Sequence, residues 1–296
     1  MKPATCFRIA LILVVVWLGR TSASGAELSV GVAKVDITPD YPVRLSGFGF
    51  RREESSGIGH RIHAKALAFS DGKLGPAILI TTDNLGVPEE ITREVAARLN
   101  SEAGVRPERL TITATHTHTA PMLRGVAPTL FGMEIPPEHQ ERIDRYTREF
   151  TEKLVGVALA AVRDLRPGTV EWGTGRVGFA KNRRKQGGPV DHDLPIVVVR
   201  DLNGKVRALW FSYACHCVTM SNNLVGGDWA GHAQAAVERD HPGAVALASI
   251  GWGADANNSG DWLDGMRAGG RAALRKYREI LARRGAAAAG AGGVDH

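Results

Sequence analysis

The chain has 296 residues, of which 44% are hydrophobic and 23% are charged, and its formal net charge is +6. This composition is that of a globular protein and excludes a chain that is disordered throughout. Three of the positive charges, Lys2, Arg8 and Arg20, lie in the first 26 residues, which contain no acidic residue. The rest of the chain therefore carries +3, and we do not predict binding to nucleic acid.

The first 26 residues have the pattern of a signal peptide. A basic start precedes an apolar run at residues 9–18, and the small residues at 24–26 suit cleavage. The run is too short for a comfortable transmembrane helix, and no later stretch is long and apolar enough to span a bilayer. We therefore expect residues 1–26 to be removed from an exported protein, either periplasmic or secreted.

The residues that follow alternate between strand and helix patterns. Apolar alternation and β-branched residues predict strands at 28–38, 62–70, 76–82, 109–115, 168–179, 194–200, 206–215 and 244–250. Apolar residues at helical spacing predict helices at 88–100, 137–165, 228–240 and 261–284. Turn signals at 71–73 and 201–204 indicate two hairpins. This order predicts one α/β domain over residues 27–284, with a mixed β-sheet and packed helices, and an Ala/Gly-rich disordered tail at 285–296.

Two cysteines follow the leader, Cys215 and Cys217, on either side of His216. A disulfide between residues i and i+2 would close a very small and strained ring. We therefore expect two small buried thiols rather than a disulfide framework.

The strand at 109–115 ends in His116-Thr-His118. Two histidines at i and i+2 on an extended chain point the same way, so both can reach one point beyond the sheet edge. Neutral imidazole is a common ligand for zinc and similar metals. The sequence thus offers a candidate metal or catalytic site, and the alternative is a pair of polar loop histidines.

Further polar residues lie where predicted strands end, and in α/β sheets sites form at strand ends. They are Asp83, His116, His118, His216 and Asp255. For His216 alone, a hydrogen-bonded core histidine is the competing reading.

A basic loop contains Asn182-Arg183-Arg184. An arginine there could hold a carbonyl or a carboxylate through two hydrogen bonds, and a solvated basic loop is the alternative.

Taken in order, these segments resemble the N-terminal catalytic domain of the neutral/alkaline (non-lysosomal) ceramidase family. Gly31-Val-Ala-Lys-Val-Asp-Ile-Thr-Pro39 looks like the family's opening segment, and Asn182-Arg183 resembles its active-site Asn-Arg segment. Thr115-His-Thr-His-Thr119 is similar to the Thr-His-Thr-His-Ser signature. Ala214-Cys-His-Cys-Val-Thr-Met220 is similar to the second histidine segment. The resemblance covers nearly all of residues 29–260.

The resemblance implies a metal-dependent amidohydrolase that cleaves an N-acyl bond in a ceramide-like lipid. It implies zinc, held by His116 and His216, with His118 handling protons or the oxyanion and Arg183 contacting the substrate or its developing charge. Asp255, in the stretch that matches another active-site segment, is a further catalytic candidate. The implied partner is a lipid-like amide, with transient contact to a membrane surface.

The chain departs from the family pattern at two places. Asn257 stands where the family has a serine proposed as a nucleophile, so only a metal-activated water route would remain. The glutamate and tyrosine that complete the family's zinc site are not identifiable, which leaves a second hypothesis of a truncated or catalytically inactive exported binding domain. A metallohydrolase on an eight-stranded barrel fits less well, because the hairpins do not match eight strand–helix units.

Overall fold

The computed structural model describes residues 28–258. The strands of the large sheet are β1 (Ser29–Asp36), β2 (His63–Ser70), β3 (Ala77–Thr82), β4 (Leu110–Ala114), β5 (Arg166–Arg176), β7 (Asp193–Asp201), β8 (Val206–Tyr213) and β9 (Val245–Ile250). A small second sheet pairs β6 (Ala180–Asn182) with β10 (Ala256–Asn258). The helices are α1 (Glu89–Ala103), α2 (Pro137–Arg163) and α3 (Asp228–Asp240), and η1 (Pro107–Arg109) is a single 3₁₀ turn.

The large sheet is mixed, as the sequence predicts. Its strand order is β4-β3-β2-β1-β5-β7-β8-β9. The pairs β3–β4 and β8–β9 are parallel, and the other neighbours are antiparallel. Both predicted hairpins are present, β2–β3 and β7–β8. Parallel neighbours require a crossover connection, and α1 and α3 provide the two that are needed here.

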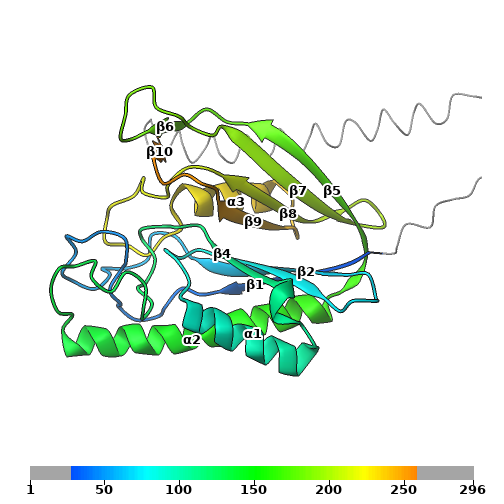
Figure 1. Cartoon of the computed structure of the whole chain (residues 1–296), viewed down its shortest axis with the longest axis horizontal. Coiled ribbons are helices and arrows are strands. Elements are labelled where there is room, and N and C mark those ends of the chain that lie inside the picture. Colours follow the sequence, from blue (N-terminus) through cyan, green and yellow to red (C-terminus); the bar gives the residue numbers. More distant parts are fainter. Residues whose placement is uncertain (1–27, 259–296) are drawn as a thin grey trace, which may run out of the picture.

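The sheet bends between β1 and β5, which share only two residue pairs near the start of β1. The strands β1–β4 and the strands β5 and β7–β9 form two halves, one above the other in Figure 1. Apolar side chains from both halves pack together between them: Val30, Leu67, Val199, Ala208 and Leu247. Helices α1 and α2 cover the first half, and α3 packs against β9 of the second half.

Helix α2 packs against β1 and β2 and buries its apolar side in a second cluster. Pro137 occupies its first turn, where a missing N–H costs nothing, and an apolar stripe that includes Tyr146 and Phe150 is fully buried. Burying side chains of this size contributes about 1.5–3 kcal/mol each. A Cβ at Gly31 would lie 1.8 Å from the Ala161 carbonyl oxygen. Glycine is therefore required where β1 crosses the end of α2.

Within the described residues every predicted element is present, with its ends shifted by up to three residues, and the chain differs from the prediction most clearly after β5. The predicted strand at 168–179 ends at Arg176, and the chain then forms β6, which pairs with β10. Three-residue strands carry no periodic signal, so neither was predicted. The predicted signal peptide, the helix at 261–284 and the tail lie outside the described residues. Within residues 28–258, no helix has the length and apolar character needed to cross a membrane.

Candidate metal centre

Two segments that are 100 residues apart in sequence lie side by side at the end of the sheet. Thr117 forms a parallel bridge with Cys217, and the His118 amide donates to the Cys217 carbonyl at 3.1 Å. The His216 amide donates to the Ala256 carbonyl at 2.8 Å, which adds the β10 segment to the group. The ends of β4, β8 and β9 therefore carry their loops to one place.

The three histidines of these loops converge. The Nε2 atom of His116 lies 3.0 Å from Nε2 of His216 and 3.3 Å from Nε2 of His118. One ligand atom from each ring lies within 4.8 Å of the others, and among the described residues this is the group of metal-ligating side chains that could hold an ion. The strand-end prediction placed these residues together correctly.

The geometric reason for that prediction was wrong. The strand stops at Ala114, and His116 has φ of 57°, in the left-handed region. The pair therefore does not share a face of an extended chain. Such a conformation costs of order 1–3 kcal/mol in a residue other than glycine and persists where the surroundings enforce it, often at functional sites. Here it turns the His116 ring toward His216.

Backbone carbonyls select the tautomer of two of the rings. Nδ1 of His116 lies 2.7 Å from the Leu85 oxygen, and Nδ1 of His216 lies 3.1 Å from the Gly253 oxygen. A carbonyl oxygen only accepts hydrogen bonds, so each Nδ1 carries the hydrogen and each Nε2 keeps its lone pair. This is the usual arrangement of metal-bound histidine.

The donor set fits a zinc-like ion. Two Nε2 atoms facing each other at 3.0 Å present two lone pairs that a metal ion between them would satisfy. Two nitrogens that each lie about 2.0–2.1 Å from one ion at a tetrahedral angle are roughly 3.3 Å apart. The observed separations of 3.0 and 3.3 Å are close to that value.

The His118 ring is half-buried beside an aromatic ring and an arginine. The Phe48 ring lies 5.1 Å from it, edge to face, and the Arg51 guanidinium donates to its backbone carbonyl. Burial, and then the neighbouring His116 and His216, lower the pKa of His118 to about 3. The imidazole is therefore neutral at physiological pH.

Gly47 allows the loop to pack against His118, and its replacement gives a test of the site. Gly47 has φ of +96°, and a Cβ there would lie 2.5 Å from the Cβ of His118. We expect Gly47→Ala to displace the ring and to weaken binding of an added divalent metal ion such as zinc roughly 10–100-fold, as changes around metal ligands do. Titration against a chromophoric chelator measures this.

The matched control is Gly72→Ala. Gly72 has φ of +74°, but nothing lies within 4 Å of the added Cβ. The Gly72→Ala variant pays about 1–2 kcal/mol for alanine in a left-handed backbone conformation but does not touch the site, so its zinc affinity should stay the same. Equal losses of affinity in the two variants would contradict the assigned packing.

The structure keeps Asp255 outside the histidine group. Its carboxylate forms an ion pair with the exposed Arg184, and its carbonyl oxygen accepts from the Arg183 amide at 2.7 Å. The Arg183 side chain is exposed, and its charge contributes to the lowered pKa of His216, after burial of that ring. Asp255 also lines an open cavity of about 670 Å³ with Trp252 and Val190, next to Ala214 and Ala256.

Asp83, which the strand-end argument also placed in the pocket, is not in ligand position either. It is buried, and it accepts from the His63 amide at 3.0 Å and from Gln234 Nε2 at 2.9 Å. The contacts that sequence reasoning missed are the carbonyls of Leu85 and Gly253. A backbone acceptor has no side-chain signature in the sequence. For the Leu85 carbonyl, the nearest sequence signal was the polar strand end at residues 83–84.

His63 makes folding sensitive to acid. Burial, and then the charges of Lys34 and Lys65, lower its pKa to about 4, against about 6.5 in an unfolded chain. Between these two pKa values the unfolded chain binds one more proton than the folded chain. The contribution of His63 to the free energy of unfolding is therefore fully present above pH 6.5 and is lost as the pH falls toward 4. Since the ring is partly exposed, we expect a loss of about 1–2 kcal/mol. Urea unfolding at pH 7 and pH 4.5 should show a smaller acid-induced loss for His63→Gln than for wild type.

The mixed sheet and its three-histidine centre define an α/β protein with a metal-type site at the strand ends. Residues 28–261 match the family model described as neutral/alkaline non-lysosomal ceramidase, N-terminal. The chain belongs to this family, and the matched part is the N-terminal domain.

Relatives and solved structures agree with this assignment. Neutral ceramidase B of Dictyostelium discoideum is 24% identical over 72% of this chain and 32% of its own, and neutral ceramidase A is 22% identical over 76% and 34%. The chain thus spans about a third of these curated relatives. The neutral ceramidase structure from Pseudomonas aeruginosa has a TM-score of 0.73 at 22% identity, over 87% of this chain and 45% of that one. A ceramidase complexed with C2 also has a TM-score of 0.73, at 21% identity over 87% and 44%. These two likenesses show the fold.

Proposed function

We propose that this domain performs zinc-dependent hydrolysis of the N-acyl amide bond of a ceramide-like lipid. The convergence of three Nε2 atoms, two of them on rings fixed by backbone carbonyls, carries the proposal. Membership of the ceramidase family supports the reaction class. The names of the relatives support the substrate class.

In this proposal His116 and His216 would hold zinc through Nε2, and the His118 ring lies beside them, with its Nε2 3.3 Å from that of His116. When bound, zinc polarises a carbonyl and acidifies water. The neutral His118 imidazole lies beside this position, where it would handle the proton of the attacking water or stabilise the oxyanion. The Arg183 guanidinium stabilises the negative charge that develops on the carbonyl oxygen.

Asp255 has a supporting role in the proposal. Its ion pair with Arg184 and its hydrogen bond from the Arg183 amide fix the loop after β6. The cavity beside it, lined by Trp252 and Val190, provides apolar surface for the acyl chain. We also propose an exported protein, periplasmic or secreted, which touches a membrane surface transiently through exposed apolar side chains such as Phe50.

The test is release of fatty acid from an N-acylsphingosine with a fluorescent acyl chain, by the purified full chain with one equivalent of zinc. His118→Ala should lower the rate about 10²–10⁴-fold, the usual contribution of a general acid–base group. Arg183→Ala should also lower it, whereas Arg176→Ala, an exposed arginine paired with Asp193, should not. Lipid binding without turnover would reject the proposal in favour of a binding domain.

A further inference from the structure

The turn after β3, residues 83–86, touches the metal centre through one backbone atom. The Leu85 carbonyl accepts from Nδ1 of His116 at 2.7 Å. This contact decides which ring nitrogen of His116 carries the hydrogen and where Nε2 points. The placement of a single carbonyl therefore controls the ligand atom, and we asked what holds that carbonyl.

Asn84 holds the turn from the side of the histidine loops. It is fully buried, and its Oδ1 accepts from the Leu85 amide at 2.7 Å. Its Nδ2 donates to the Pro121 carbonyl at 3.4 Å, in the segment that follows His118. One amide side chain thus ties the Leu85 turn to the loop that carries two of the three rings.

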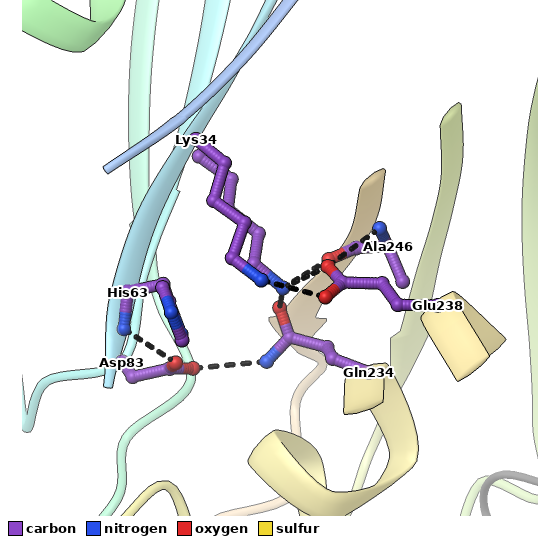
Figure 2. Close-up of polar contacts among 7 residues, drawn as sticks. Lys34, His63, Asp83, Gln234, Glu238 and Ala246 are labelled. Atoms are coloured by element: carbon purple, nitrogen blue, oxygen red, sulfur yellow. Dashed lines mark hydrogen bonds and ion pairs between the residues drawn. The ribbon is translucent and has the colours of Figure 1, made fainter. Parts of the chain in front are cut away.

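Asp83 holds the same turn from the opposite side. Its carboxylate accepts from the His63 amide on β2 at 3.0 Å and from Nε2 of Gln234 on α3 at 2.9 Å. Figure 2 shows Gln234 reaching from α3 to the Asp83 carboxylate, beside His63. The turn is therefore connected to both halves of the molecule.

Lys65 determines which way the Gln234 amide faces. The Lys65 ammonium donates to Gln234 Oε1 at 2.9 Å, to Glu238 Oε1 at 2.8 Å and to the Ala246 carbonyl at 2.6 Å. Its three hydrogens have three acceptors, so Gln234 Oε1 is held toward the lysine. The Nε2 end must then face Asp83. Lys65, Gln234 and Asp83 are each only 2% exposed.

We propose that Gln234, together with Asn84, is a positioning residue for His116. Lys65 orients Gln234, Gln234 fixes Asp83, and the turn from Asp83 to Leu85 places the carbonyl that sets the His116 tautomer. A role of these contacts in catalysis rests on the proposed function. Their effect on the position and tautomer of His116 does not depend on the proposed function.

The alternative is that these contacts only stabilise the fold, and two near-isosteric variants separate the two cases. Gln234→Glu keeps an oxygen that accepts from Lys65, but it replaces the Nε2 donor to Asp83 with a carboxylate oxygen that cannot donate. Glu238→Gln also alters a partner of Lys65 but does not touch Asp83. Both should lower the melting temperature. Only Gln234→Glu should raise the zinc dissociation constant, by roughly 10–100-fold.

A second readout needs neither zinc nor turnover. In metal-free protein at pH 8, the ¹⁵N resonances of His116 report which nitrogen is protonated. We expect the Nδ1–H form in wild type and Glu238→Gln, and a mixture of tautomers in Gln234→Glu. If Gln234→Glu does not fold, Asn84→Asp removes the donor to Pro121 and should give the same mixture.

Equal changes in zinc affinity for the two α3 variants, with His116 unchanged in both, would overturn the inference. A wild-type protein that binds zinc but hydrolyses no N-acyl lipid would reject the proposed function alone. If wild type binds no zinc, the tautomer measurement still decides between positioning and stability.

Discussion

Replacing His216 with alanine is expected to abolish stoichiometric zinc binding. The variant removes one of two imidazoles whose Nδ1 is held by a carbonyl and whose Nε2 faces the other at 3.0 Å. Loss of a hydrogen-bond partner of a metal ligand lowers metal affinity roughly 10–100-fold, so loss of a ligand itself should lower it further. Equilibrium dialysis against zinc, followed by metal analysis, measures the bound equivalents.

His139→Ala is the control, because His139 lies in the first turn of α2 and belongs to no cluster of metal-ligating groups among the described residues. It should retain one equivalent of zinc. Retention of a full equivalent by His216→Ala at the wild-type affinity would show that the histidine centre is not where the ion binds.

Lys65→Met is expected to destabilise the folded chain by about 3 kcal/mol, the lower end of the range for breaking a buried ion pair. Methionine fills the space but leaves Gln234 Oε1 and the Ala246 carbonyl without their donor. Glu238 keeps two partners, since Lys34 donates to its Oε2 at 2.7 Å and the Ala246 amide donates to its Oε1 at 3.1 Å. Urea unfolding at pH 7 gives the difference in free energy.

Lys34→Met is the matched control for this measurement. Lys34 contacts the same carboxylate, but its side chain is 32% exposed. Pairs of this kind contribute about 0–1 kcal/mol, so the control should change stability little. Equal losses from the two lysines would mean that burial of Lys65 does not determine its contribution.

The sequence was sufficient for most of the fold because its elements are periodic. The apolar stripe of α2 and the β-branched runs of β2, β3 and β4 carry the 3.6- and 2-residue periods. Turn residues between neighbouring runs marked both hairpins. The bend between β1 and β5 was not predictable, since it depends on two residue pairs that are far apart in sequence, Ser29 with Pro167 and Val30 with Arg166.

The three histidines of the site could be grouped from the sequence, but their geometry could not be predicted. Strand ends and the order of motifs brought His116, His118 and His216 into one group, and the structure places them together. The left-handed turn at His116 and the carbonyls of Leu85 and Gly253 have no side-chain pattern to read. A carboxylate such as Asp255 at a strand end looked equivalent to the histidines, yet it pairs with Arg184 instead.

X-ray absorption at the zinc edge of the loaded full chain tests the central claim most directly. The histidine centre predicts one ion per chain, with a first shell at about 2.0–2.1 Å and the outer-shell scattering of imidazole rings. His116→Ala should bind less zinc, and any bound ion should show weaker imidazole scattering than in wild type. A shell with sulfur at about 2.3 Å, or one without imidazole scattering, would contradict the assignment of the site to these three histidines.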